Sequence, residues 1–150
     1  MFPRFSAAIL GALTVIACSD SSGPAELSIA QLTGTWKLSR LEMTLASDTS
    51  VSQDVLASVG LSVTLTINRS GSSVLVVQEP GQPSMSSPAT ISLRGDTLVF
   101  DVEGSGSPYE AIVRLAGRTM TWRSLETNLW DLDSDGTPEN VFEQDVWQRQ

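Results

Sequence analysis

From Leu61 onward, apolar and polar residues alternate with a period of two, and this pattern limits the fold more than any other feature of the chain. In LSVTLTIN, residues 61–68, every odd-numbered residue is a large aliphatic one and every even-numbered residue is polar. Successive side chains of a strand point to opposite faces, so the alternation is typical of an antiparallel strand with one buried face. Similar stretches recur between short turns rich in Gly, Pro and Ser, and together they predict an all-β domain.

The pattern predicts eight short strands, most of them joined by tight turns. Such a series favours an eight-stranded antiparallel up-and-down barrel, with a β-sandwich of similar size as the alternative. A closed barrel leaves no exposed sheet edge, which matters in a chain that cannot form an internal disulfide. The expected strands cover residues 34–44, 61–68, 73–79, 89–93, 97–103, 109–115, 119–125 and 141–149.

One short helix is expected between the first two strands, within ASDTSVSQDVLASVG, residues 46–60. Apolar residues recur there at helical spacing, a residue near Ser50 can cap the start, and Gly60 can end the helix. The segment ELSIAQL, residues 26–32, can form a single helical turn before the first strand.

The N-terminal segment MFPRFSAAILGALTVIA, residues 1–17, has a basic start and an apolar run too short to span a bilayer with ordinary flanks. It ends in VIAC and resembles a bacterial lipoprotein signal. The resemblance implies cleavage before Cys18, a lipid on its sulfur, and residues 18–26 as a polar tether. Ser19 after the cysteine, by the same resemblance, favours the outer membrane of the cell envelope. An ordinary secretory signal with an incidental cysteine is the alternative, although Cys18 is the only cysteine and lipidation explains a lone thiol.

The charge and the residue types exclude several functions. The chain has seventeen acidic and nine basic residues, a net charge of −8, which repels phosphate groups and disfavours nucleic-acid binding. It contains no histidine, which removes His-based acid–base catalysis, Ser–His and Cys–His nucleophiles and ordinary zinc sites. We therefore expect no enzyme. A paired-carboxylate hydrolase stays open, but it needs two acids in one cleft, and strand phasing places nearly all acids outside or in turns.

The stretch LTGTWKLSRLE, residues 32–42, begins the first strand with Gly34, Thr35 and Trp36. A Gly-x-Trp after a short helical turn resembles the first-strand signature of the lipocalins and their calycin relatives. The resemblance covers residues 27–150 and implies an eight-stranded barrel whose tryptophan closes the base under a basic side chain. Arg149 matches that side chain by position, and Arg123 is a second candidate.

A barrel of eight strands has an interior that is either filled by side chains or large enough for one small ligand. The candidates for a ligand pocket are large apolar residues on the inward phase, and residues 51–59 would form a lid over its mouth. The alternative is that these residues pack against each other and leave no cavity. The pocket candidates are Leu65, Ile67, Phe100, Val113, Met120 and Trp122, with Val74, Val76 and Leu98 also expected to face inward.

The segment DLDSDGTPE, residues 131–139, matches the first half of an EF-hand calcium loop, in which alternate carboxylates surround the ion. The position of the bidentate glutamate is occupied by Phe142, and strands flank the segment. Seven acids and no Lys or Arg lie between residues 124 and 148, so a cation would relieve repulsion there. The alternative is a solvated acidic turn. The candidate calcium ligands are Asp131, Asp133, Asp135, Thr137 and Glu139.

These observations lead to one expectation and one rival. We expect a lipid-anchored, non-enzymatic, lipocalin-like protein of the bacterial envelope that binds a small apolar ligand in the barrel. The rival is a ligand-free structural or protein-interaction module with a calcium-stabilised acidic hairpin.

Overall fold

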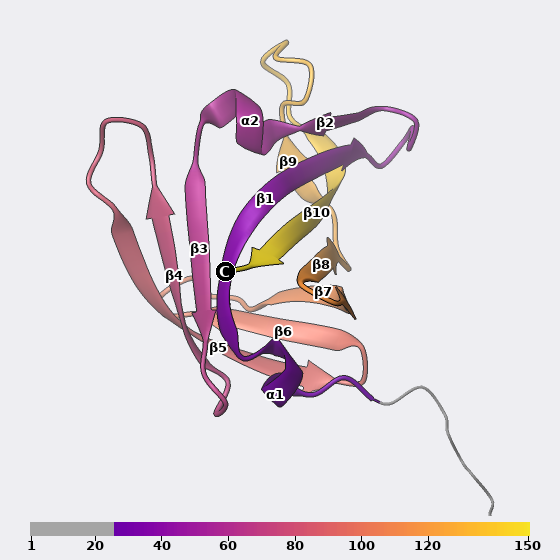
Figure 1. Ribbon diagram of the computed structural model, residues 1–150. Helices are drawn as coiled ribbons and strands as arrows, with labels where there is room; N and C mark the ends of the chain where they lie inside the picture. Colours follow the sequence, from indigo (N-terminus) through magenta and orange to yellow (C-terminus); the bar gives the residue numbers. More distant parts are fainter. Residues whose placement is uncertain (1–25) are drawn as a thin grey trace, which may run out of the picture.

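All the strands in the described part of the chain join one antiparallel sheet, which closes because its first strand pairs with its last (Figure 1). The computed structural model describes residues 26–150. The expected signal segment 1–17, Cys18 and nearly all of the expected tether lie outside the described residues. Residues 26–150 contain no helix that is long and apolar enough to cross a membrane.

The chain order of the elements follows the expected series, with two short strands added. The elements are α1 (Ile29–Leu32), β1 (Gly34–Leu45), β2 (Ser52–Asp54), α2 (Val55–Val59), β3 (Ser62–Ile67), β4 (Ser72–Gln78), β5 (Met85–Arg94), β6 (Thr97–Val102), β7 (Tyr109–Ala116), β8 (Thr119–Ser124), β9 (Asn128–Trp130) and β10 (Glu139–Arg149).

The barrel wall has eight strands, β1, β3 to β8 and β10, and the predicted eight-stranded antiparallel barrel is confirmed. On one side, β1 pairs with β10 from Trp36 opposite Arg149 to Leu45 opposite Val141. On its other side, its first residues pair with β3 and residues 42–44 pair with β2. The short strands β2 and β9 therefore extend the wall at one end only, the end that carries α2 and the loop before β10 (Figure 1).

The register of β1 shifts between Leu38 and Arg40, where the strand bulges. The hydroxyl of Ser39 donates to the backbone carbonyl of Val146, at 2.8 Å. An extra residue in one strand lets side chains three positions apart point to the same face. Leu38 and Leu41 both point into the barrel for this reason, and they line the same cavity.

The phase of β4 is the reverse of the expected one. Ser73 is buried and Leu75 lies opposite the fully buried Leu65, whereas Val74 is 39% exposed. Val76, two residues further, shares the outer face with Val74. The stretch SVLVV has apolar residues on both phases, so the sequence pattern does not define which residues face inward. The pairing of β4 with β3 decides it.

The helix between the first two strands is shorter than expected, because it begins after Asp54 and not near Ser50. Residues 52–54 instead pair with β1 as β2, and Val51 is exposed. The carboxylate of Asp54 accepts from the backbone N–H of Leu56 at 3.2 Å and so caps the helix. At the other end, Gly60 has a φ of 68° and ends the helix as expected.

The interior is filled at one end of the barrel, which we call the base, where α1 lies (Figure 1). Leu32 of α1 packs there against inward side chains of the wall and is fully buried. A second, smaller cluster joins Val55 of α2 to Met43 and Val141 at the opposite end. Farther from the base, inward side chains of the first cluster border a hollow part of the barrel, and the candidate site lies there.

Candidate functional site

The base of the barrel is closed by Trp36 and Arg149. The indole of Trp36 is fully buried and its N–H donates to the carbonyl of Leu32 at 2.7 Å. The guanidinium carbon of Arg149 lies 4.4 Å from the centre of that indole, close enough for a cation–π contact. Of the two basic residues considered for this position, Arg149 occupies it, and Arg123 lies over Phe142 on another part of the wall.

The guanidinium of Arg149 also ties the helical turn to the barrel. It donates to the carbonyl of Thr33 at 3.0 Å and to that of Gln31 at 2.6 Å. Gly34 has a φ of 137°, and a Cβ there would lie 3.5 Å from the guanidinium nitrogen. A glycine at this position therefore allows both the backbone conformation and the close approach of the arginine. These contacts make the Gly34–Trp36–Arg149 group a structural closure of the base.

Four of the six pocket candidates lie in the filled part of the barrel. Their side chains are at most 2% exposed and pack against each other and against the base, so they border no space for a ligand. These four are Leu65, Ile67, Val113 and Met120.

The other two candidates, Phe100 and Trp122, reach a cavity of about 310 Å³ in the hollow part of the barrel. Its wall is mostly apolar and comes from seven strands and from the β6–β7 turn. The lining residues are Leu38, Leu41, Val63, Leu75, Phe100, Val102, Ser105, Ser107, Tyr109, Trp122, Glu143, Asp145 and Trp147. No residue of α2 belongs to this wall, so the expected lid over the mouth is not part of the cavity.

Two carboxylates of β10, those of Glu143 and Asp145, face this cavity. Asp145 is only 6% exposed and lies between Leu41 of β1 and Trp122 of β8. The expectation that strand phasing keeps the acids outside was wrong for these two. The sequence did contain a signal: Arg149 at the base and Trp147 fix the inward phase of β10, and that phase includes Asp145 and Glu143.

The electrostatics of the two carboxyl groups follow from their burial. Burial, and then the charge of Glu143, raise the pKa of Asp145 well above its usual value. Burial also raises the pKa of Glu143, although a hydrogen bond from the amide of Asn128, at 3.1 Å, favours its charged form. No hydrogen-bond donor of residues 26–150 reaches the side chain of Asp145.

Three hydrogen-bond donors around the cavity are also unpaired. The hydroxyl of Tyr109 and the indole N–H groups of Trp122 and Trp147 are buried and have no partner among the described residues. Burial, with the nearby Glu143 and Asp145, raises the pKa of the Tyr109 hydroxyl, which stays protonated. Buried polar groups are nearly always hydrogen-bonded in folded proteins. Unpaired donors and carboxylates around one cavity are therefore typical of a binding site rather than of a filled core.

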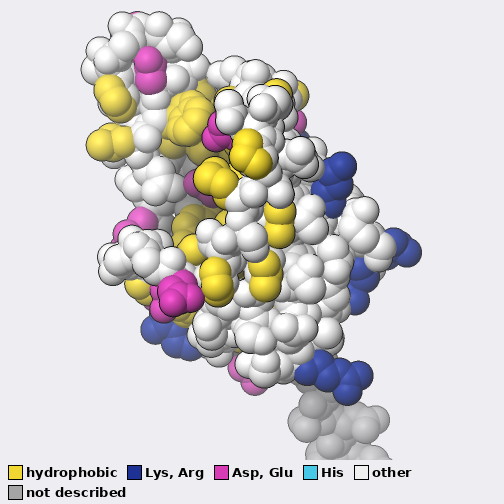
Figure 2. All heavy atoms as spheres, turned by 90° about the vertical axis from the view of Figure 1, so that its left-hand side faces the viewer, with side chains coloured by type: hydrophobic (Ala, Val, Ile, Leu, Met, Phe, Trp, Pro, Cys, Tyr) yellow, Lys and Arg dark blue, Asp and Glu magenta, His cyan; other side chains and the backbone are white. Residues whose placement is uncertain are grey.

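The cavity is acidic and hydrophobic, with basic residues elsewhere. The face in Figure 2 is hollowed, and hydrophobic and acidic side chains gather around the hollow, whereas Lys and Arg lie towards the edges of the molecule. No Lys or Arg lines the cavity. The two ion pairs in the described part of the chain, Arg40 with Glu42 and Arg94 with Glu110, involve neither carboxylate of the cavity.

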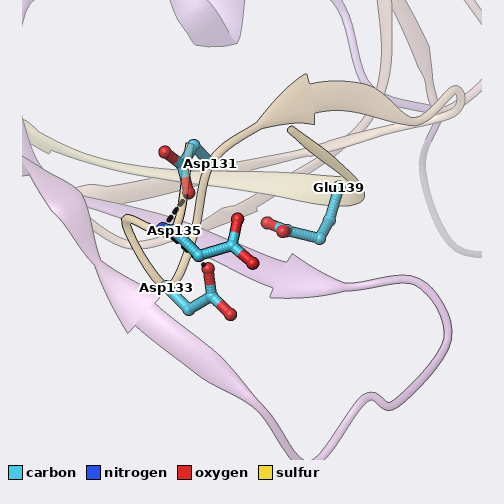
Figure 3. Close-up of side chains that lie close together, drawn as sticks. All are labelled: Asp131, Asp133, Asp135 and Glu139. Carbon is cyan, nitrogen blue, oxygen red and sulfur yellow. Dashed lines mark hydrogen bonds between the residues drawn. The ribbon is translucent and has the colours of Figure 1, made fainter. Parts of the chain in front are cut away.

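A second candidate site is the acidic loop between β9 and β10, which brings together the side chains of Asp131, Asp133, Asp135 and Glu139 (Figure 3). One carboxylate oxygen of each lies within 4.8 Å of the others.

Backbone N–H groups hold the acidic loop in this shape. Asp131 accepts from the N–H groups of Asp135 and Gly136, both at 3.0 Å, and Glu139 accepts from Leu132 at 2.8 Å. Thr137, the fifth candidate ligand, donates its backbone N–H to Asp135 at 2.7 Å. Calcium prefers oxygen ligands. The four clustered side chains offer only carboxylate oxygens, so their chemistry suits a calcium ion.

No family model and no curated protein sequence matches this chain. The two sites therefore have to be interpreted from their own geometry.

Proposed function

We propose that the protein is a lipocalin-like binding protein of the bacterial envelope, held to the outer membrane by a lipid on Cys18. Its role is to hold a small, largely apolar ligand in the cavity of the barrel. The anchor rests on the Ala17–Cys18 junction after the apolar run. The observation that carries the binding role is the cavity of about 310 Å³, which is lined mostly by aliphatic and aromatic side chains. Ligand sites are concave, mostly apolar and equipped with a few polar groups, and this cavity has that composition.

The proposed role needs no catalytic step. Hydrolysis by paired carboxylates places the two acids on either side of the bond that breaks. Glu143 and Asp145 are two residues apart on one strand and so belong to one wall of the cavity. This placement suits two groups that contact the same end of a ligand.

The test is to fill the cavity and to compare a matched change outside it. Leu75→Trp places a large ring in the cavity, and Val74→Trp, on the neighbouring position of β4, places the same ring on the outer face. Each protein, produced with Cys18→Ala, is exposed to a lipid extract of its own cells, purified and weighed by native mass spectrometry.

We expect a ligand mass on the parent protein and on Val74→Trp and none on Leu75→Trp. A bare mass on all three proteins would overturn the binding role. Ligand retained by Leu75→Trp would place the binding site elsewhere. The anchor is tested separately, because Cys18→Ala in the full chain should move the protein from the membrane to the soluble fraction.

A second function is favoured by the acidic loop: a protein-interaction hairpin stabilised by calcium. Leu129, in the strand before the loop, is 69% exposed, and Trp130 beside it is also exposed. Calcium bound by Asp131, Asp133, Asp135 and Glu139 would offset their repulsion and fix the hairpin that presents these apolar side chains. The site has no bidentate glutamate at its end, so a weak, extracellular-type affinity is expected.

A further inference from the structure

The cavity wall contains acids that an apolar ligand would leave without a partner. Asp145 is more than nine-tenths buried, borders the cavity and receives no hydrogen bond from the described residues. Glu143 borders the same cavity and receives one, from the side-chain amide of Asn128. A buried charge without a partner is strongly unfavourable, so the missing partner is expected to come from the ligand.

We propose that the cavity binds an organic ammonium, with its protonated nitrogen at Asp145 and Glu143 and its apolar body among the surrounding side chains. This inference rests on the proposed binding role and specifies the class of ligand. It adds the requirement that the ligand carries a positive charge, which a purely apolar ligand lacks.

The aromatic side chains of the wall support a cationic ligand. Phe100, Trp122 and Trp147 form a chain of tilted rings, with centre-to-centre distances of 5.4 Å and 5.1 Å, and all three border the cavity. Tyr109 adds a fourth ring to the same wall. The faces of aromatic rings attract ammonium groups, most strongly where water is excluded. Carboxylates beside aromatic rings therefore give both the charge and the surface that an alkylammonium or arylalkylammonium ion needs.

The other ligand classes fit this cavity less well. An anion would meet two carboxylates and no basic side chain. A small divalent metal ion needs about six oxygen ligands or retained waters, and the wall supplies mainly carbon. A neutral apolar molecule would leave Asp145 to be neutralised by a proton. An ammonium ion takes the place of that proton and keeps the carboxylate charged.

The binding test compares three ligands that share one chain and differ in the charge of the head group. Octylamine, octanol and octanoate have cationic, neutral and anionic heads on an eight-carbon chain. Each is titrated into the protein carrying Cys18→Ala at pH 8, and the affinity is measured by isothermal titration calorimetry. The fluorescence of the wall tryptophans gives a second readout. We expect octylamine to bind about tenfold or more tightly than octanol, since a hydrogen bond to a charged group contributes at least that much. Octanoate should bind least.

Two variants connect this preference to the carboxylate. Asp145→Asn keeps the shape of the side chain and removes its charge, so the preference of octylamine over octanol should fall to about twofold or less. Asp101→Asn makes the same change on the exposed face of β6 and should leave the preference intact. Glu143→Gln is measured in parallel, so that a folding defect in one variant does not decide the result.

Each outcome bears on one proposal or on both. If octanol binds as tightly as octylamine, the ammonium inference fails and the apolar binding role stands. If none of the three ligands binds, and the lipid extract also leaves the protein bare, both fail. A preference for octylamine that survives both Asp145→Asn and Glu143→Gln would overturn the assignment to these carboxylates.

Discussion

Arg149 and Asp145 lie on the same face of β10, but the charge of Arg149 has partners and that of Asp145 has none among the described residues. At the base, the guanidinium of Arg149 stacks on Trp36 and donates to two carbonyls. In the hollow part, the carboxylate of Asp145 receives no hydrogen bond from the described residues, and its burial lowers the stability of the folded protein. A chain selected for stability alone would not keep a buried acid there, because an apolar residue of similar size would remove that cost. The comparison assigns the base to the fold and supports the proposal that the cavity binds a ligand.

The largest expected effect is at the base. Trp36→Ala removes a fully buried indole and its hydrogen bond to Leu32, and it leaves Arg149 without its ring. The free energy of unfolding should fall by about 3–5 kcal/mol, as for other buried aromatic residues. Urea denaturation followed by circular dichroism measures it. Trp130→Ala, at an exposed position, is the control and should cost about 0.5 kcal/mol. Similar losses in the two variants would contradict the role given to the base.

The next effect separates the shape of Arg149 from its charge. Arg149→Lys keeps the charge but loses the planar group that stacks on Trp36 and donates to two carbonyls at once. We expect a loss of about 2 kcal/mol in urea denaturation, which is the contribution of hydrogen bonds that involve a charged group. Arg114→Lys, on the exposed phase of β7, should change the stability by less than about 0.5 kcal/mol. An unchanged stability of Arg149→Lys would mean that charge alone closes the base.

The cavity should respond in the opposite direction. Asp145→Asn removes a buried, unpartnered carboxylate and should stabilise the ligand-free protein by about 1.5 kcal/mol at pH 8. The pKa of Asp145 is raised in the folded state, so between the unfolded value near 3.8 and that raised pKa only the folded protein holds the proton. The parent protein therefore gains stability as the pH falls from 8 towards 4.

The measurement is a set of urea unfolding curves across that pH range for the parent and for Asp145→Asn. The difference in the free energy of unfolding between the two proteins should shrink as the pH falls. Glu143 has a raised pKa as well, so the double variant with Glu143→Gln should show the flattest dependence. A difference that stays constant with pH would mean that folding does not raise the pKa of Asp145.

The smallest effect belongs to the acidic loop. Calcium at about five times its dissociation constant should stabilise the protein by about 1 kcal/mol, seen as a rise in Tm by differential scanning calorimetry. Asp133→Asn removes one of the four clustered carboxylates and should abolish most of the rise, whereas Asp101→Asn should not. An equal rise in both variants would show that calcium acts on the overall negative charge and not on the loop.

The barrel could be predicted from the sequence because strands such as residues 61–68 are apolar on one phase only. Where both phases carry apolar residues, the alternation gave no answer. In β4 the inner face was assigned to Val74 and Val76, and pairing with β3 selects Leu75 instead. The helix was expected to start near Ser50 because single-sequence patterns do not include the pairing of residues 52–54 with β1.

The cavity was harder to predict than the wall for a related reason. In VFEQDVWQR, Phe142 and Val146 make one phase plausible and Val141 and Trp147 the other. The acids fall on the same phase as Trp147, so a rule that places acids outside selects the wrong face. The pairing of Trp36 with Arg149 decides the phase, and it joins residues 113 positions apart in the chain. The acidic loop, by contrast, is local, and its four carboxylates came together as the spacing of residues 131–139 indicated.

The end of β10 closes the barrel against the start of β1. The backbone N–H of Gln150 donates to the carbonyl of Thr35 at 2.9 Å, and Arg149 sits on Trp36 one residue before it. The ribosome makes β1 well before β10, so the edge of β1 that pairs with β10 stays unpaired until β10 has been made. Contacts between the ends of a chain also form slowly, because a long loop has to close first. Before β10 pairs with it, β1 has an exposed strand edge, and a chaperone that protects the chain at this stage would need to cover that edge.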